Sequence, residues 1–411
     1  MILIKRYNIK PHNDFELNIK RESLLTYHIS YNTNKKAEGI VFLLPGRGVD
    51  SSFKYQKKLM RYISEEYNVL AVFVEYHSIF SRVVKDEKKS AKYGFSRDDT
   101  DILFYMLKKY DLVLDENNLD FNSIIHQLEA QIRDKKSKNE FTDEFKLKLT
   151  ATLYPYKNEY ENFGVVQAID ILTVLYHLKE IGYKNIIKNK PLITVGNSHG
   201  GYISYLLRKF APNTFDVIIE NSSYIKPYLK SIIGFENDIN DSEVDLFYPN
   251  IILNCFVKSY WNLNENSSYY FNKTAYEIRD LSNTLQNKQL LKYGNKTEII
   301  SYHSAFDTLA PYKDKLDYYN YMKLNNYNIK LNIISSENQI DGRLIKNLNH
   351  AMGMSTKELI NKEIPTILKN KKKSTPTDLS KKSIIEYNTS LNDTYRFEFK
   401  KNKIKVKLLK Q

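Results

Sequence analysis

Short apolar runs alternate with segments of helical periodicity along most of the chain. Buried strands are predicted from the apolar runs at residues 39–44, 69–75, 192–195, 216–220, 297–302 and 329–334. Helices are predicted from the patterns at residues 53–67, 165–181, 202–210, 312–323 and 356–368. Because strands that alternate with helices form parallel sheets, the pattern predicts an α/β fold: a mostly parallel sheet with helices on both faces.

Two long segments interrupt this alternation. Residues 77–164 carry helical patterns, and residues 222–296 are rich in Tyr, Asn and Phe and include Trp261. Both are too long to be bare loops in a compact domain. We therefore expect one α/β domain over residues 39–368 that carries a helical insertion at 77–164 and a cap at 222–296. Residues 1–38 are expected to supply further strands that join the sheet.

Composition indicates a globular chain. Of its 411 residues, 42% are hydrophobic and 13% aromatic, which is enough to bury a large core. The single cysteine, Cys255, cannot form an internal disulfide, and no Cys/His pairs stand at metal-ligand spacing, so we expect neither a metal nor another cofactor. The N-terminus lacks the pattern of a secretory signal, and the longest core-like apolar run is far shorter than the roughly 20 residues of a membrane span. A cytoplasmic protein without a membrane span is the expectation.

Positive charge is concentrated at the C-terminal end. Residues 369–411 hold 13 Lys and Arg against 4 Asp and Glu, which gives a net of +9 out of +14 for the whole chain. The alternating residues at 395–399 and 404–408 predict a small β-element, a hairpin, in this extension. Such a basic surface could dock on nucleic acid or anionic lipid. Because the rest of the chain is nearly balanced in charge, we expect no dedicated nucleic-acid partner.

One serine stands between glycines at the end of an apolar run. Residues 195–201 read Val-Gly-Asn-Ser-His-Gly-Gly, between a predicted strand and a predicted helix. This setting holds a nucleophilic serine on a strained turn with its hydroxyl exposed above a sheet. With 13 glycines in 411 residues, a chance Gly-x-Ser-x-Gly is expected only about 0.03 times in the chain. The alternative is an ordinary turn in which Ser198 caps the helix.

A serine nucleophile needs a base that takes its proton. Downstream of Ser198, and apart from His199 within the motif, the histidines are His303 and His350. His350 follows the strand at 329–334 and its loop, whereas His303 is expected to be a loop residue just before the candidate acid. We therefore favour His350 as the base.

The base in turn needs an acid that orients it. Asp307 follows the strand at 297–302 and precedes a helix that begins at a proline. Sites in open parallel sheets are built at the carboxyl ends of strands, which favours Asp307. Glu337 and Asp341, in the loop before the candidate base, are the alternatives, and both can also be read as solvated loop charges.

The negative oxygen that develops during attack needs two backbone donors. One is expected to be the N–H of His199, directly after the serine. The second should come from the loop after the strand at 39–44, where Gly46 and Gly48 flank Arg47. The glycines would let the backbone approach a substrate, and a plain turn is the alternative. A guanidinium at this place could bind a carboxylate or phosphate through paired hydrogen bonds, unless the arginine faces solvent.

Together, the motif at 196–201, the segment from Asp307 to Pro311 and the late His350 resemble the α/β-hydrolase superfamily, in particular its prolyl-oligopeptidase-like and esterase branches. The resemblance covers residues 39–75, 165–220 and 297–368. It implies the α/β-hydrolase fold and assigns a nucleophile, base and acid to Ser198, His350 and Asp307. It also implies the backbone N–H groups of Arg47 and His199 as oxyanion donors. The loop at residues 45–48 reads Pro-Gly-Arg-Gly and departs from the His-Gly-Gly-Gly pattern of the superfamily. The identity of the second backbone donor is therefore left open.

The function expected from these residues is that of a serine hydrolase, a carboxylesterase or deacylase that forms an acyl-enzyme. Acyl transfer to an acceptor other than water would use the same intermediate. Residues 160–165 read Tyr-Glu-Asn-Phe-Gly-Val, directly before the long predicted helix. With this segment, the chain as a whole resembles a bacterial family often found in flagellar-glycosylation and surface-glycan gene clusters, which implies an acylated sugar or glycan precursor as the substrate. The alternative is an inactive hydrolase-fold protein that binds a glycan or a partner protein through the aromatic cap at 222–296, where Trp261 is the candidate contact.

Replacement of Arg47 tests its expected role in specificity. If the guanidinium binds an anionic group of the substrate, Arg47→Ala should raise the KM for an acidic ester far more than the KM for a neutral ester. Steady-state kinetics on a matched pair of esters measure the difference. Equal effects on the two substrates would remove this role.

Overall fold

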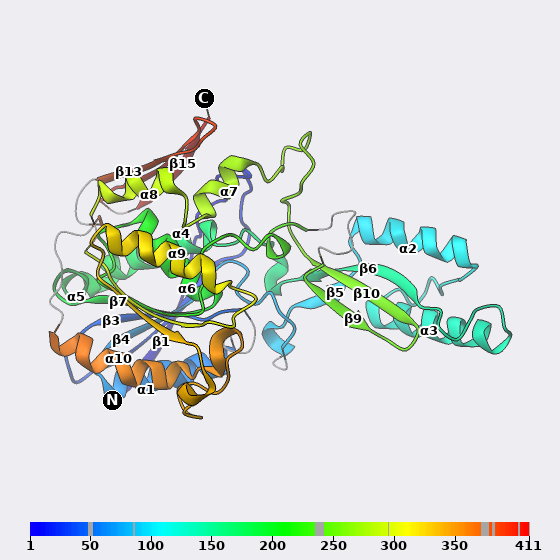
Figure 1. The fold of residues 1–411 in the computed structure, drawn as a ribbon, viewed down its shortest axis with the longest axis horizontal. Coiled ribbons are helices and arrows are strands. Elements are labelled where there is room, and N and C mark those ends of the chain that lie inside the picture. The colour runs from blue at the N-terminus through cyan, green and yellow to red at the C-terminus, as the bar shows by residue number, and fades with distance from the viewer. Residues whose placement is uncertain are drawn as a thin grey trace. The chain divides into compact units, whose positions relative to one another are not determined.

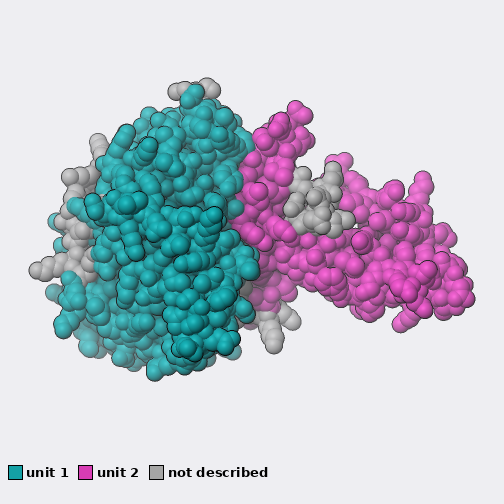
Figure 2. Space-filling model, viewed as in Figure 1, with its two compact units in different colours: residues 1–79, 163–227, 272–411 teal, residues 80–162, 228–271 magenta. Residues whose placement is uncertain are grey.

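The structure, a computed structural model, describes residues 1–47, 52–84, 87–234, 242–294, 296–370, 378–379, 383–401 and 403–410. The chain divides into two units, shown in different colours in Figure 2. Unit 1 comprises residues 1–79, 163–227 and 272–411, and unit 2 comprises residues 80–162 and 228–271.

An eight-stranded sheet forms the centre of unit 1 (Figure 1). Its strands, in spatial order, are β1 (Ile2–Ile9), β2 (Leu25–Asn32), β4 (Leu70–Glu75), β3 (Ile40–Leu44), β7 (Leu192–Asn197), β8 (Val217–Asn221), β11 (Glu298–Ser304) and β12 (Ile329–Ile334). The strands β1 and β2 run antiparallel to their neighbours, and every pair from β4 to β12 is parallel. The order of the central strands places β7, which carries the serine motif, between β3 and β8.

Helices cover both faces of this sheet. The helices α1 (Phe53–Glu66) and α10 (Thr356–Asn370) lie on one face, and α4 (Val165–Leu178), α6 (His199–Phe210) and α9 (Tyr312–Leu324) lie on the other (Figure 1). Unit 1 also contains α5 (Lys184–Asn189), α7 (Lys273–Arg279) and α8 (Thr284–Leu291). Strand order, strand direction and covered faces together make this the α/β-hydrolase fold, as predicted. The predicted strands and helices of the sheet are confirmed, with ends shifted by a few residues.

The basic C-terminal extension folds as part of unit 1. The strands β13 (Ser383–Asn388), β14 (Thr394–Phe399) and β15 (Ile404–Leu409) form an antiparallel sheet, so the predicted hairpin is confirmed and gains a third strand. Its buried side packs on α6: the ring of Phe397 stacks on Phe210 with centroids 4.3 Å apart, and the hydroxyl of Tyr387 donates to the carbonyl of Lys209 at 2.5 Å. The inner side of the extension therefore belongs to the core of unit 1.

Unit 2 has a sheet of its own. Its strands, in spatial order, are β5 (Lys92–Gly94), β6 (Leu147–Tyr154), β10 (Ile251–Val257) and β9 (Val244–Phe247), with β6 and β10 parallel. The helices α2 (Arg97–Tyr110) and α3 (Phe121–Ser137) pack on this sheet, and their leucines and isoleucines share one core with the apolar residues of β6 and β10. Cys255 is buried in this core, and burial, with the charges of Asp99 and Asp245, raises the pKa of its thiol to about 12.

This unit differs from the organisation expected from sequence. The segments 77–164 and 222–296 were expected as a helical insertion and a separate cap, but parts of both, 80–162 and 228–271, build one sheet. The pairing of β6 with β10 joins residues far apart in the chain, such as Leu147 and Ile251, and local periodicity cannot show such a contact. Within the described ranges, no helix combines the length and apolarity needed to cross a membrane.

Buried ion pairs attach the segment between β1 and β2 to the rest of unit 1. Arg279 of α7 donates two hydrogen bonds to Glu16, at 2.8 and 2.6 Å, and both side chains are almost completely buried. Arg21 makes a similar two-bond contact with Asp170 of α4, at 2.6 and 3.0 Å. The hydroxyl of Tyr395 in β14 also donates to Glu16, at 2.7 Å, so one carboxylate connects the N-terminal segment, α7 and the C-terminal sheet.

Removal of the Glu16 charge should destabilise unit 1. Glu16→Gln leaves the guanidinium of Arg279 buried without its counter-charge, which we expect to cost about 3 kcal/mol in the free energy of unfolding. Urea denaturation followed by circular dichroism measures this change. Glu22→Gln, at an exposed position of the same segment, is the matched control and should cost less than about 0.5 kcal/mol. Equal stability of the two variants would contradict this role of the buried pair.

Candidate active site

Ser198 lies on the turn between β7 and α6. Its backbone has φ 49° and ψ −116°, which puts a residue with a side chain in a region that favours glycine. The N–H of Ser198 donates to the carbonyl of Asn221 at 2.7 Å, so the turn is attached to the end of the neighbouring strand β8. Such strain at one residue is the geometry expected of an exposed nucleophile.

The glycines beside Ser198 allow this turn because a side chain has no room there. A Cβ on Gly196 would lie 2.5 Å from the carbonyl oxygen of Gly200. A Cβ on Gly200 would lie 1.7 Å from the carbonyl oxygen of Leu44, at the end of β3. The scarce glycines of the motif are therefore required by the close approach of α6 to β7 and β3.

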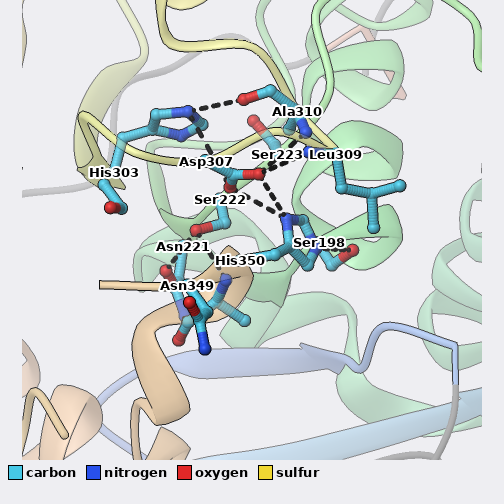
Figure 3. A network of polar contacts seen from close by, with 12 residues as sticks. Ser198, Asn221, Ser222, Ser223, His303, Asp307, Leu309, Ala310, Asn349 and His350 are labelled. Atoms are coloured by element: carbon cyan, nitrogen blue, oxygen red, sulfur yellow. Dashed lines mark hydrogen bonds and ion pairs between the residues drawn. The ribbon is translucent and has the colours of Figure 1, made fainter. Parts of the chain in front are cut away.

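Figure 3 shows a chain of three side chains that meet at the carboxyl edge of the sheet. The Nε2 atom of His350 lies 2.8 Å from the Oγ atom of Ser198. The Nδ1 atom of His350 lies 2.8 and 3.0 Å from the two carboxylate oxygens of Asp307. Because a carboxylate only accepts hydrogen bonds, Nδ1 carries a proton in this contact and Nε2 is left to accept the proton of the serine hydroxyl. The structure thus brings together the three residues that the sequence singled out.

Asp307 is held in place by its own loop. Its carboxylate accepts the backbone N–H groups of Leu309 at 3.0 Å and Ala310 at 2.8 Å. Burial by itself would raise the pKa of Asp307, but the interaction with His350 and the hydrogen bond from the backbone N–H of Ala310 outweigh it, so the pKa lies below its usual value. The carboxylate is therefore ionised at neutral pH and can orient the imidazole.

The other two candidate acids have different surroundings. Glu337 is exposed. The carboxylate of Asp341 accepts the backbone N–H groups of residues 343, 344 and 345, so it shapes its own loop. Among the described residues, the carboxylate that contacts His350 is that of Asp307.

His303 differs from its expectation as a loop residue. The strand β11 extends to Ser304, so His303 belongs to the strand and is fully buried behind Asp307. Burial, and next the positive charge of Lys315, lower the pKa of His303 to about 4, which makes its ring neutral at neutral pH. Its Nε2–H group donates to the carbonyl of Ala310 at 2.9 Å, so His303 supports the loop that holds Asp307 (Figure 3).

His350 lies on a strained loop that β8 supports. The residues after it, Ala351 and Met352, both have positive φ, at 60° and 53°. The N–H of Ala351 donates to the hydroxyl of Ser222 at 3.1 Å, and the side-chain amide of Asn221 donates to the carbonyl of Ala351 at 3.0 Å. Sequence reasoning missed Asn221 and Ser222, although their place directly after a predicted strand beside the serine motif was an available signal.

The two backbone segments expected to supply oxyanion donors both lie beside Ser198. The N–H of His199 is the first of α6, so no carbonyl of that helix can accept it. Gly46 lies against the serine, since a Cβ added to it would be 3.1 Å from the Cβ of Ser198. The hydroxyl of Tyr76 donates to the carbonyl of Pro45 at 2.7 Å and holds this loop. Gly48, the other predicted glycine of the loop, lies outside the described residues.

The imidazole of His199 points away from the hydrogen-bond chain of Ser198. Its Nε2 atom lies 2.6 Å from the side-chain oxygen of Gln167. Burial, and next the charge of Arg47, lower the pKa of His199 well below its usual value, so the ring is neutral and Nε2–H donates to Gln167. The side-chain amide of Gln167 donates in turn to the carbonyl of His77 at 2.8 Å. The ring of His199 therefore supports the structure around Gln167.

Arg47 lies at the site beside an aromatic cluster. Its guanidinium lies 5.8 Å from the ring centre of Phe163, at a distance that allows a cation–π contact. The ring of Phe163 packs on His199 at 4.7 Å and on Tyr224 at 5.9 Å, and Tyr224 lies 6.0 Å from the ring of His350. Sequence reasoning missed Phe163 and Tyr224, because nothing local distinguishes them from the many other aromatic residues of this chain.

Trp261, the candidate substrate contact, belongs to unit 2. It is 5% exposed and packs edge-on against Phe271, with ring centroids 5.3 Å apart. Within the described ranges, no group of three or more His, Cys, Asp or Glu side chains could hold a metal ion.

Comparison with known proteins gives one family and several distant structures. A family model described as "Protein of unknown function (DUF2920)" matches residues 5–408. No curated protein matches the chain.

Three solved structures illustrate the distant matches. Acylaminoacyl peptidase from Pyrococcus horikoshii is 13% identical, with a TM-score of 0.45 over 91% of this chain and 42% of the peptidase. Esterase Pf2001 from Pyrococcus furiosus is 11% identical, with a TM-score of 0.42 over 90% of this chain and 91% of the esterase. Peroxisomal α/β-hydrolase Lpx1 from Saccharomyces cerevisiae is 12% identical, with a TM-score of 0.42 and 92% of both chains covered. The chain spans only 36 to 42% of the length of three peptidases that it matches.

Proposed function

The chain belongs to the DUF2920 family, and from the geometry of its site we propose that it is a serine hydrolase of the carboxylesterase or deacylase type. One observation carries the proposal: Ser198 Oγ, on its strained turn, lies 2.8 Å from His350 Nε2, and His350 Nδ1 lies 2.8 Å from Asp307. A hydroxyl, a base and an orienting carboxylate in hydrogen-bond contact are the parts that activate a serine at neutral pH.

In the proposed reaction, the Oγ atom of Ser198 attacks the carbonyl carbon of an ester or amide while His350 Nε2 takes the hydroxyl proton. The N–H of His199 and a backbone N–H of the loop at Gly46 and Arg47 stabilise the negative oxygen. The tetrahedral intermediate then expels the alcohol or amine, which receives the proton from His350. A water molecule then attacks the carbonyl carbon of the acyl-enzyme while His350 Nε2 takes its proton. The second tetrahedral intermediate expels the Oγ atom of Ser198, which receives that proton from His350, and the acid is released.

As the substrate we propose an acylated sugar or glycan precursor, the class that the overall resemblance implies. The guanidinium of Arg47 beside the ring of Phe163 supports a ligand that combines an anionic group with an apolar face. A role for Trp261 in substrate binding is part of the proposal. If an alcohol took the place of water, the same acyl-enzyme would transfer its acyl group to that alcohol.

A fluorophosphonate probe tests the proposed nucleophile. Attack of the serine oxygen on phosphorus expels fluoride and leaves a stable covalent adduct, so the wild type should label and Ser198→Ala should not. Ser204→Ala, which removes another buried hydroxyl of α6, is the matched control and should retain the label. A panel of esters of increasing acyl length, run on the wild type and on Ser198→Ala, then defines the acyl group.

A folded wild type that never labels would contradict the proposal and favour the inactive binding protein. Labelling of Ser198→Ala at the wild-type level would also contradict it, because the reactive residue would then lie elsewhere.

A further inference from the structure

Unit 2 contains a cavity of about 310 Å³ at the carboxyl ends of its two parallel strands. Tyr154 ends β6 and Val257 ends β10, and both line the cavity. The start of α2 contributes Ser96 and Asp98 to the wall. The loop after β10 contributes residues 258–262. In open α/β sheets, ligands bind at the carboxyl ends of strands, so this is the place in unit 2 where a ligand site is expected.

Three polar groups of the wall are available to a ligand. Within the part of the chain that the structure describes, the carboxylate of Asp98 and the hydroxyls of Tyr154 and Tyr260 have no hydrogen-bond partner. Asp98 is exposed and Tyr260 is 40% exposed. A carboxylate accepts hydrogen bonds and a phenol both donates and accepts, so together they suit a ligand rich in hydroxyl groups.

The rest of the wall is held in position by contacts within unit 2. The hydroxyls of Ser96 and Thr152 both donate to the buried carboxylate of Asp99, at 2.7 and 2.6 Å. The ammonium of Lys258 donates to the carbonyl of Asn158 at 3.2 Å and lies 5.4 Å from the ring centre of Tyr154. The wall is thus preformed, which lowers the entropic cost of binding.

The charges and rings of the wall narrow the class of ligand. One negative charge, Asp98, stands against one positive charge, Lys258, so a neutral ligand fits better than an anion or a cation. The rings of Tyr154, Tyr260 and Trp261 offer apolar surface beside the polar groups. A sugar ring has the complementary surface, with apolar C–H faces and a rim of hydroxyls.

We propose that this cavity is a carbohydrate-binding site for a single neutral pyranose ring. Its volume lies at the lower end of the roughly 300–1,000 Å³ range of ligand pockets, which suits one ring rather than a long chain. Asp98 accepts two neighbouring hydroxyls of the sugar, Tyr260 covers one of its faces, and the hydroxyl of Tyr154 bonds at the rim. The cavity is lined by residues of unit 2 alone and includes Trp261, the substrate contact proposed above. Binding of a sugar there does not require the proposed chemistry at Ser198.

The single tryptophan of the chain reports directly on this site. Trp261 lines the cavity, and because the sequence holds one Trp, its fluorescence is not mixed with that of other indoles. We expect a saturable change in emission when the full-length protein is titrated with at least one of four probes: methyl α-D-glucopyranoside, methyl α-D-galactopyranoside, methyl α-D-mannopyranoside and N-acetyl-D-glucosamine. Asp98→Asn should weaken the binding of that probe about tenfold, since it replaces a charged acceptor with two oxygens by a neutral amide with one.

Matched variants separate this site from the fold and from the triad. Asp101→Asn removes an exposed charge from the same helix outside the cavity wall and should bind the probe as the wild type does. Ser198→Ala should also bind unchanged, so failure of the hydrolase proposal and failure of the sugar site are distinguished. The proposal is overturned if none of the four sugars gives a saturable change, or if Asp98→Asn binds as tightly as Asp101→Asn. Saturation by n-butylamine but by no sugar would also overturn it, since the cavity would then be a site for cations.

Discussion

The close approach of α6 to β3 is the constraint on which the candidate active site depends. Gly200 lies so near the carbonyl of Leu44 that a Cβ would reach to 1.7 Å. Because α6 lies this close to β3, the chain passes from β7 into α6 through a sharp turn. Ser198 lies on that turn with a φ of 49°. The same approach brings Gly46 into contact with the serine. One steric condition thus exposes the nucleophile and places backbone N–H groups beside it.

Adjacent parallel strands supply the remaining groups. The ends of β8, β11 and β12 follow one another beside β7, and the loops after them carry Ser222, Asp307 and His350 in that order. Each loop is held by a neighbour: Ser222 accepts the N–H of Ala351, and the neutral ring of His303 supports the loop of Asp307. The short contacts to His350 therefore rest on a rigid sheet edge, which is the kind of support that keeps reacting groups at productive distances.

Sequence reasoning reached the serine, the acid and the base because each carries a local signal. Ser198 lies among scarce glycines, and Asp307 and His350 follow apolar runs in the chain order of one fold. The aromatic neighbours of the site, Phe163 and Tyr224, carry no such signal, since only tertiary packing selects them from 33 Tyr and 20 Phe. The sheet of unit 2 was missed for a similar reason. The strands β6 and β10 pair across a wide gap in the chain, and periodicity within either segment cannot show that contact.

The central claim is that the carboxylate of Asp307 orients His350 as the base for Ser198. The most direct test is the kcat of Asp307→Asn on an ester that the wild type hydrolyses. Asparagine keeps the shape of the acid but donates to Nδ1 of His350, so Nε2 would carry the proton and could not accept that of Ser198. We predict a fall in kcat of about four orders of magnitude at neutral pH, while Glu337→Gln, at the exposed alternative acid, keeps the wild-type value. A kcat for Asp307→Asn within tenfold of the wild type would contradict the account, because the carboxylate would then not orient the base.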